Sequence, residues 1–306
     1  MRHIKTVIAC AAIQLLLFPC LWAKTGVTAA DFLMLPVGAR ASSMGEAFVA
    51  LANDSSAIFW NPAGITSMSW TELSATYSAW IDGVSVGNLC CAVPLGKDSG
   101  LGIGVTYLDS GSMEKTDAGE NVTGSYSSGD IASTVGYARK VADDLSLGCS
   151  VKYISEKIDA VSGTGFAADA GGLYSTKMAD LPVTLGVAAT NFGPKMGPGE
   201  KSDLPSALRA GAAVNVVKDV LTFSGEITSY QKSDTVAGIG AEYLISNLFT
   251  LRLGYRLLRS DLSGMEPVTA GFGIFYTEKY DFMLDYAFAD MGTLGPTHRV
   301  SVGMRL

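Results

Sequence analysis

Apolar and polar residues alternate with a period of two over most of the chain from Glu72 onward. Leu73, Ala75 and Tyr77, for example, are separated by hydroxyl side chains. Successive residues of a strand point to opposite faces, so such a run predicts a strand with one apolar and one polar face. The other runs have the apolar members Leu101, Ile103, Val105 and Tyr107; Leu145, Leu147, Cys149, Val151 and Tyr153; Val183, Leu185, Val187 and Ala189; Phe249, Leu251, Leu253 and Tyr255; Val268, Ala270, Phe272, Ile274 and Tyr276; and Phe282, Leu284, Tyr286 and Phe288.

The N-terminus indicates export, and the composition indicates a membrane environment. A basic start, an apolar run over residues 6–22 and the small residue Ala23 are typical of a secretory signal peptide, so we expect residues 1–23 to be removed. A retained membrane anchor is the alternative. After Ala23 no apolar stretch reaches the length of a membrane-spanning helix. The chain is nevertheless 48% hydrophobic and only 17% charged, as expected if strands face lipid.

The spacing of the strands predicts a barrel with two different rims. Roughly 14 strand segments follow one another, an even number as in single-chain bacterial barrels. Short polar turns are predicted at residues 95–100, 140–144, 177–182, 217–220, 245–247 and 277–281. Between them, on the opposite rim, a tight turn at residues 82–83 is followed by longer loops at residues 109–124, 155–165, 192–205, 230–234, 259–267 and 289–297. Alternating loop lengths favour an outer-membrane barrel over a propeller or sandwich.

The segment before the strands is different in kind. Met44, Phe48 and Leu51 lie at helical spacing, which predicts a helix over residues 41–52, followed by a turn and a helix cap at residues 53–56. We therefore expect residues 24–70 to form a small helical plug, or hatch, and residues 71–306 to form the barrel. A helical cap on the rim is the alternative. Glycines inside the strands would let the plug approach the wall closely; they are Gly102, Gly104, Gly211, Gly254, Gly271, Gly273 and Gly303.

Charged residues lie on the polar face of several predicted strands. If the apolar residues face lipid, the lumen receives Lys152, Arg209, Glu226, Glu242, Arg252, Arg256 and Asp285. Both signs are present, so these charges can pair in a network that fills the barrel and seats the plug. A polar conduction path is the alternative. Within the plug, Arg40 and Glu46 are candidates for contacts with wall charges.

The residue inventory excludes several classes of function. Beyond the signal segment, His298 is the one remaining histidine, so a two-histidine metal site or a catalytic relay with a second histidine cannot form within this chain. We expect no enzyme activity, no cofactor and no metal. The net charge of −7 argues against binding to nucleic acid. Cys90, Cys91 and Cys149 are odd in number, which argues against a disulfide framework.

Four short motifs in the plug segment resemble a known family signature. They are Gly38-Ala39-Arg40, residues 44–50, residues 53–57 beginning with Asn53-Asp54, and Trp60-Asn61-Pro62-Ala63-Gly64. This signature resembles that of the PorV/PorQ family, which is similar in turn to the FadL group of outer-membrane transporters. The resemblance implies a 14-stranded barrel in which Asn61, Pro62, Ala63 and Gly64 form the turn of the hatch.

Two functions follow from this resemblance, and the sequence leans slightly toward the first. FadL-like members pass hydrophobic molecules, so a plugged lumen would admit small hydrophobic compounds. PorV-like members serve type IX secretion, so the alternative is a non-transporting protein that docks exported cargo at the outer membrane. We expect outer-membrane lipid and the barrel assembly machinery as partners, with a hydrophobic small molecule or a secreted protein as ligand. If the short turns lie on the periplasmic side of the membrane, both termini are expected in the periplasm.

Overall fold

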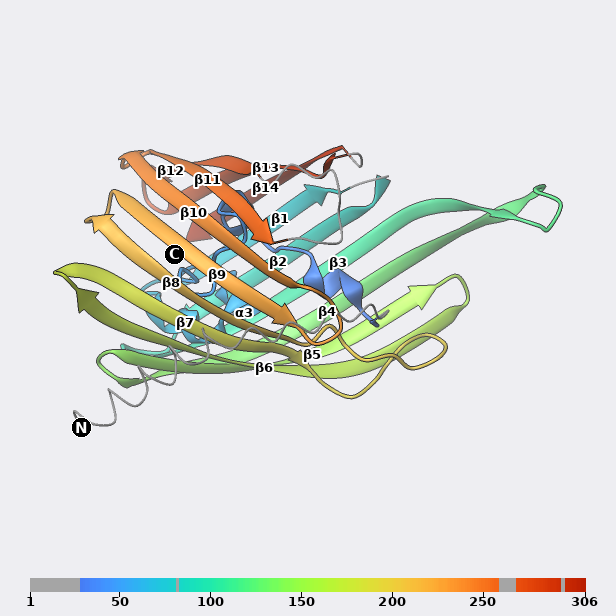
Figure 1. Cartoon of the computed structure of the whole chain (residues 1–306), viewed down its shortest axis with the longest axis horizontal. Coiled ribbons are helices and arrows are strands. Elements are labelled where there is room, and N and C mark those ends of the chain that lie inside the picture. The colour runs from blue at the N-terminus through green and yellow to red at the C-terminus, as the bar shows by residue number, and fades with distance from the viewer. Residues whose placement is uncertain (1–27, 81–82, 259–267, 293–294) are drawn as a thin grey trace.

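The computed structural model describes residues 28–80, 83–258, 268–292 and 295–306. In these residues, fourteen antiparallel strands follow chain order around a closed barrel, and β14 pairs with β1 (Figure 1). The predicted all-β, 14-stranded membrane barrel is therefore confirmed. The strands are β1 (Glu72–Ala79), β2 (Ser85–Pro94), β3 (Ser99–Thr116), β4 (Val122–Ala142), β5 (Leu145–Ile158), β6 (Val161–Met178), β7 (Leu181–Phe192), β8 (Ala207–Val217), β9 (Leu221–Tyr230), β10 (Thr235–Ser246), β11 (Phe249–Leu258), β12 (Val268–Thr277), β13 (Asp281–Asp290) and β14 (Pro296–Arg305).

The barrel wall has an apolar outer face and a polar inner face. Leu253 and Val151 are each 62% exposed, whereas their chain neighbours Arg252 and Lys152 are 7% and 5% exposed. This difference follows from the period of two, because adjacent residues lie on opposite sides of the wall. An apolar exterior around a polar interior is the arrangement of a barrel that spans a membrane. Among the described residues, no helix is long and apolar enough to cross one.

The two rims differ, as the spacing predicted. One rim carries turns of two to four residues at 95–98, 143–144, 179–180, 218–220, 247–248 and 278–280; we call it the short-turn rim. The opposite, long-loop rim includes the connection 193–206 and a hairpin of β3 and β4 that projects far beyond its neighbours (Figure 1). The predicted loop at 259–267 and part of the turn at 82–83 lie outside the described residues.

Two segments of the long-loop rim that the sequence predicted as loops are mostly paired β-strand. Residues 109–124 form the outer end of the β3–β4 hairpin, whose turn is confined to residues 117–121. Residues 155–165 likewise contain paired strands around the turn 159–160. The glycine- and serine-rich sequence suggested loops because it lacks the apolar alternation. Strand pairing needs only backbone groups, and a ribbon that extends beyond the bilayer has no lipid-facing side to make apolar.

The plug consists of four short helical pieces joined by turns. They are η1 (Asp31–Met34), α2 (Ala39–Ser43), α3 (Ala57–Trp60) and η2 (Pro62–Ser67). The predicted helix over 41–52 is wrong beyond Ser43. Gly45 and Glu46 adopt positive φ angles of 64° and 66°, which a right-handed helix does not permit. Met44 and Phe48 are nevertheless fully buried, because the plug lies inside the barrel and packs against wall side chains as well as against itself.

The ends of the described chain lie at opposite rims. Near its start, the Ala29 amide donates to the Asp203 carbonyl oxygen (2.9 Å) in the connection 193–206 of the long-loop rim. At its end, the Leu306 amide donates to the Thr71 carbonyl oxygen (2.9 Å), just before β1 on the short-turn rim. The expected signal peptide, residues 1–23, and the adjoining residues 24–27 lie outside the described residues. The chain therefore runs through the lumen before it enters the wall.

Candidate functional site

The turn Asn61-Pro62-Ala63-Gly64 lies at the centre of the plug. Asn61 is fully buried. Its side-chain amide donates to the carbonyl oxygens of Val49 (2.9 Å) and of Gly172 on β6 (3.2 Å). Its Oδ1 accepts a hydrogen bond from the Ala63 amide (3.2 Å), which caps η2. One asparagine thus joins two parts of the plug to each other and to the wall, which alanine at this position could not do.

Glycines form much of the inner wall around the plug. A Cβ atom added to Gly148 would lie 2.5 Å from the Ala63 nitrogen, and one added to Gly254 would lie 2.0 Å from the Gly45 nitrogen. Further wall glycines at which an added Cβ would come within 3 Å of a plug atom are Gly100, Gly102, Gly104, Gly136, Gly171, Gly186, Gly211, Gly238, Gly240 and Gly271. Plug atoms, some of side chains and some of the backbone, thus pack directly against the wall backbone on both sides of the lumen.

Two glycines from the sequence analysis have a different role. An added Cβ at Gly273 would meet the side chains of Asp285 and Arg252, and one at Gly303 would meet the Met283 side chain. These positions make room for side chains of the wall, whereas the ten glycines above and Gly148 and Gly254 make room for the plug.

The side chain of Glu226 on β9 binds the backbone of the plug. Its Oε2 accepts hydrogen bonds from the amides of Phe48 (2.8 Å) and Val49 (2.7 Å), and its Oε1 accepts one from Arg209 on β8 (2.9 Å). The Arg209 guanidinium in turn lies 4.9 Å from the centre of the Trp60 ring, at cation–π distance. The carboxylate is almost completely buried, so each of these donors compensates for lost hydration.

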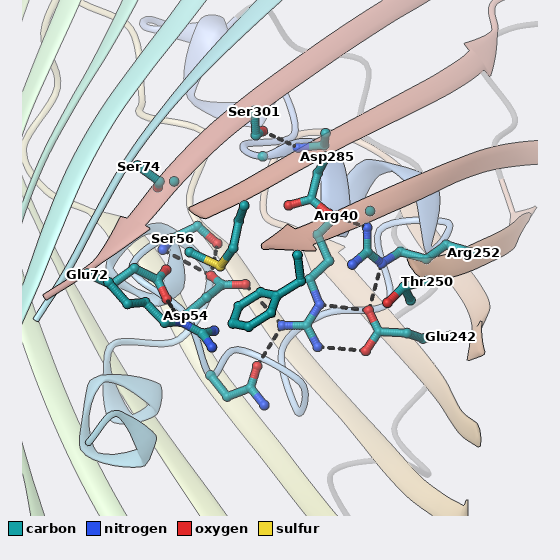
Figure 2. A pocket seen from close by; sticks show the side chains of 18 of the residues that line it. Arg40, Asp54, Ser56, Glu72, Ser74, Glu242, Thr250, Arg252, Asp285 and Ser301 are labelled. Atoms are coloured by element: carbon teal, nitrogen blue, oxygen red, sulfur yellow. Dashed lines mark hydrogen bonds and ion pairs between the residues drawn. The ribbon is translucent and has the colours of Figure 1, made fainter. Parts of the chain in front are cut away.

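Arg40 connects the plug to β10, the strand next to β9 (Figure 2). It donates twice to the Glu242 carboxylate on β10, each time at 2.8 Å, and its Nη1 lies 3.1 Å from Asp54. Glu242 also accepts a hydrogen bond from Arg252 on β11 (2.7 Å), which reaches Asp285 on β13 (2.5 Å). Bidentate arginine–carboxylate pairs fix orientation as well as distance. This chain of charges therefore sets how α2 is rotated in the lumen.

The remaining predicted charges lie nearer the long-loop rim. Lys152 donates to Asp169 (3.0 Å) and to Asn191 (2.6 Å), all of them buried. Arg256 donates to the Asp290 carbonyl oxygen (2.8 Å), and its guanidinium lies 4.0 Å from the carboxylate of Glu46 in the plug. Both plug residues singled out by sequence, Arg40 and Glu46, thus lie beside wall charges. The seven predicted wall charges form several separate groups and no continuous path.

The lumen is filled on one side of the plug and open on the other. Toward the long-loop rim, Ala29 and Phe32 pack against Ile154, Met196 and Leu204 in an apolar cluster. Toward the short-turn rim, a cavity of about 670 Å³ lies between the plug and the parts of β1 and β9 to β14 nearest that rim. Arg40, Glu242, Arg252 and Asp285 line this cavity, as Figure 2 shows. The open part of the interior is therefore charged.

Several residues that hold the plug were missed by the sequence analysis. Glu72 accepts from the Ser55 amide (2.8 Å) and from Arg305 (2.9 Å). Thr269 accepts from the Gly45 amide (3.1 Å), and Arg299 donates to Ser42 (2.8 Å). Each occupies an inward position of its strand, so the period of two could have placed it. Which plug atom it meets depends on strand register, which the alternation does not specify.

No group of three or more histidine, cysteine or acidic side chains in the described part of the chain is arranged to hold a metal ion. His298 lies on the outer face of β14, where its Nδ1 is 2.7 Å from the Tyr286 hydroxyl oxygen. The described cysteines are unpaired. The interior thus offers charge pairs and backbone donors, and its chemistry is that of binding and positioning.

The closed wall, the apolar exterior and the inserted plug define an outer-membrane β-barrel. Residues 23–233 match a family described as Type IX secretion system protein PorV, and the chain belongs to this family. The family resemblance inferred from the plug motifs is therefore confirmed. The protein is accordingly an outer-membrane component of type IX secretion from a family whose members are not enzymes. A comparison with curated proteins finds no match.

Solved structures with the same fold include the toluene transporter TodX of Pseudomonas putida, with 15% identity, a TM-score of 0.58 and coverage of 93% of this chain and 98% of that chain. The CymD monoaromatic hydrocarbon channel has 14% identity, a TM-score of 0.57 and coverage of 88% and 96%. A Pseudomonas aeruginosa FadL homologue has 14% identity, a TM-score of 0.57 and coverage of 89% and 98%. At such identities the likeness shows the fold, which is FadL-like, and no ligand.

Proposed function

We propose that this protein docks exported cargo of type IX secretion at the outer membrane and does not conduct solutes through its lumen. Family membership supports this role over the passage of small hydrophobic compounds, toward which the sequence analysis leaned. The observation that carries the proposal is the seated plug, which packs against wall glycines and donates two backbone hydrogen bonds to Glu226.

The interior gives little support to passage of an apolar compound. The space toward the long-loop rim contains the chain's own apolar residues, Ala29 and Phe32. The cavity on the other side of the plug is lined by three arginines and five carboxylates. A site for a hydrophobic molecule would be predominantly apolar with a few polar groups. We therefore assign the lumen a structural role.

The long-loop rim offers a surface for a protein partner. The hairpin of β3 and β4 is braced by the neighbouring hairpin of β5 and β6, because Lys115 contacts Asp159 (2.8 Å) and the Asp159 amide donates to Ser127 (3.1 Å). An ordered surface loses less conformational entropy on binding than a mobile loop does. We place this rim outside the cell, where exported cargo arrives, and the short-turn rim and the C-terminus in the periplasm.

We assign the parts of the chain to a signal peptide, a plug and a barrel. Residues 24–70 act as the plug, residues 71–306 as the barrel, and residues 1–23 as a signal that is removed. Asn61 to Gly64 form the turn of the hatch. Arg40 and Glu46 provide polar contacts between the plug and the wall, and the charged wall residues that face the lumen hold the plug in place. The expected periplasmic N-terminus concerns residues outside the described range, and Thr28 is already close to the long-loop rim. Lipid and the barrel assembly machinery are needed for insertion.

A shortened hairpin tests the docking role. Residues 110–128 are replaced by Asn-Gly, which joins Asp109 to its register partner Gly129 through a favoured two-residue turn. We expect the barrel to assemble, as judged by heat-modifiable migration, and cargo to accumulate without reaching the cell surface. The matched control exchanges Lys97 and Asp98 for alanine on the short-turn rim. Normal secretion by the shortened protein would contradict the docking role. If, in addition, a strain that lacks the protein no longer takes up a labelled aromatic hydrocarbon, the transport role would be supported instead.

A further inference from the structure

The cavity on the short-turn side of the plug has the form of a socket. Its volume of about 670 Å³ lies within the range of ligand pockets, roughly 300–1,000 Å³. The plug closes its inner end through Gly38, Ala39 and Arg40. Trp70 and Asp219, which are exposed at the short-turn rim, line its outer end. A ligand would therefore enter and leave from the same side.

The lining of the socket carries excess negative charge. The charged lining residues are Arg40, Arg252, Arg305, Asp54, Glu72, Asp219, Glu242 and Asp285, three cations against five anions. Each arginine is already engaged by a carboxylate: Arg40 and Arg252 by Glu242, and Arg305 by Glu72. An anionic ligand would have to break these pairs and would meet net repulsion. A cationic ligand meets net attraction and leaves the pairs in place.

Acceptor atoms of the socket remain available to a ligand. Asp285 contacts Arg252 through Oδ1, and its side chain keeps 19% exposure. Figure 2 shows this carboxylate above Arg40, on the same side of the cavity as Glu242 and Arg252. Nearer the mouth, the apolar side chains that line the cavity are Trp70, Leu244, Phe275 and Met283. The Arg305 guanidinium covers two of the rings, 4.5 Å from the centre of Trp70 and 5.3 Å from that of Phe275, which leaves Leu244 and Met283 open to the cavity. The socket thus combines a carboxylate at depth with an apolar collar.

We propose that this socket binds a cationic group, an ammonium or guanidinium, carried on an apolar stem. The carboxylate of Asp285 pairs with the cation, and the apolar side chains of Leu244 and Met283 cover the stem. A lysine- or arginine-bearing peptide segment of a partner at the short-turn rim has this chemistry, and so does a free alkylamine. The proposal does not rest on the docking role, because it concerns the opposite side of the plug.

The test uses the full-length mature protein, purified in a non-ionic detergent, and isothermal titration calorimetry. The probes are the peptides acetyl-Ala-Lys-Ala-amide, acetyl-Ala-Gln-Ala-amide and acetyl-Ala-Glu-Ala-amide, with n-butylammonium as the free cation. We expect saturable one-to-one binding of the lysine peptide, at least tenfold weaker binding of the glutamine peptide and none of the glutamate peptide. Binding should weaken with added salt. Equal binding of n-butylammonium would identify a free amine as a sufficient ligand, and tighter peptide binding would identify a peptide.

Three variants show whether binding occurs in the socket. Asp285→Asn keeps a hydrogen-bond acceptor for Arg252 and should raise the Kd of the lysine peptide at least tenfold. Thr222→Trp fills the cavity and should abolish binding, while heat-modifiable migration reports that the barrel is intact. Asp143→Asn removes the same charge from a short turn outside the cavity and should leave the Kd unchanged. Absence of saturable binding, or equal effects of Asp285→Asn and Asp143→Asn, would overturn the proposal.

Discussion

Two arcs of the barrel wall hold the plug in different ways. Along β3 to β6, η2 lies directly against the strands, and glycines in the wall let plug side chains, and at Gly148 the plug backbone, pack against the strand backbone. Along β9 to β14, glycines receive only residues 43–45, and nearer the short-turn rim a cavity bridged by charged side chains separates plug and wall. The first arc packs along the whole of η2, whereas the second combines close contact at residues 43–45 with charged contacts beside a cavity that leaves room for a ligand.

Removal of a carboxylate that contacts the plug backbone should have the largest effect. In Glu226→Ala the amides of Phe48 and Val49 lose their acceptor, and Arg209 is left as a buried charge without this partner. Breaking a buried ion pair costs about 3–5 kcal/mol. We expect increased cleavage of the plug by added protease and a lower thermal midpoint of the purified protein.

The conservative variant separates charge from hydrogen bonding in this contact. Glu226→Gln keeps an oxygen that can accept from one or both amides, so its loss of plug protection should be smaller than that of Glu226→Ala. Equal protease protection in Glu226→Ala and the unaltered protein would contradict the assigned role of this side chain.

A single methyl group added to a wall glycine of the β3 to β6 arc should have the next largest effect. In Gly148→Ala the new Cβ would lie 2.5 Å from the Ala63 nitrogen, so the backbone of the hatch turn must shift. Overpacking of this kind costs about 1–3 kcal/mol. Protease protection of the plug should fall, whereas barrel assembly should persist because the strand pairs are unchanged.

Gly225 on β9 provides the matched control. A Cβ added there would have its nearest neighbour at 3.7 Å, an ordinary contact on the outer face. Gly225→Ala should therefore leave plug protection unchanged. If both alanine variants behave alike, close backbone approach does not hold the plug.

A charge removed beside the cavity should have the smallest effect. Arg252→Ala takes one partner from Glu242 and one from Asp285, but Arg40 continues to neutralise Glu242 and the cavity admits water to both carboxylates. We expect a loss of about 1 kcal/mol in the free energy of unfolding, because hydrogen bonds in hydrated surroundings contribute little net stability. Chemical denaturation measures it. A loss as large as that of Gly148→Ala on β5 would show that the two arcs hold the plug alike.

The sequence predicted the wall better than the plug. Alternation placed Leu253 outside and Arg252 inside, since a period of two needs no knowledge of neighbouring strands. It did not reveal that Arg252 meets Glu242, because pairing depends on register. Helical spacing of Met44 and Phe48 predicted burial correctly but the wrong conformation, because tertiary contacts around Gly45 override local preference.

The candidate site was predicted in part. Its wall charges, such as Glu242 and Arg252, could be named because a charge on the polar face of a membrane strand must point into the lumen. The glycine contacts could be anticipated only as a class, since nothing local indicates which glycine meets which plug atom. The cavity could not be anticipated at all, because it is the space left between the plug and the wall, and its shape depends on how the two pack.

The central claim, that the protein works with its plug seated, is tested most directly by locking the plug to the wall. The hydroxyl oxygens of Thr66 in η2 and Ser146 on β5 lie 2.8 Å apart, so Thr66→Cys with Ser146→Cys can form a disulfide between them. We predict that oxidised cells carrying this pair secrete type IX cargo at the unaltered rate. Secretion that stops on oxidation and returns on reduction, with either single-cysteine variant unaffected, would contradict the account.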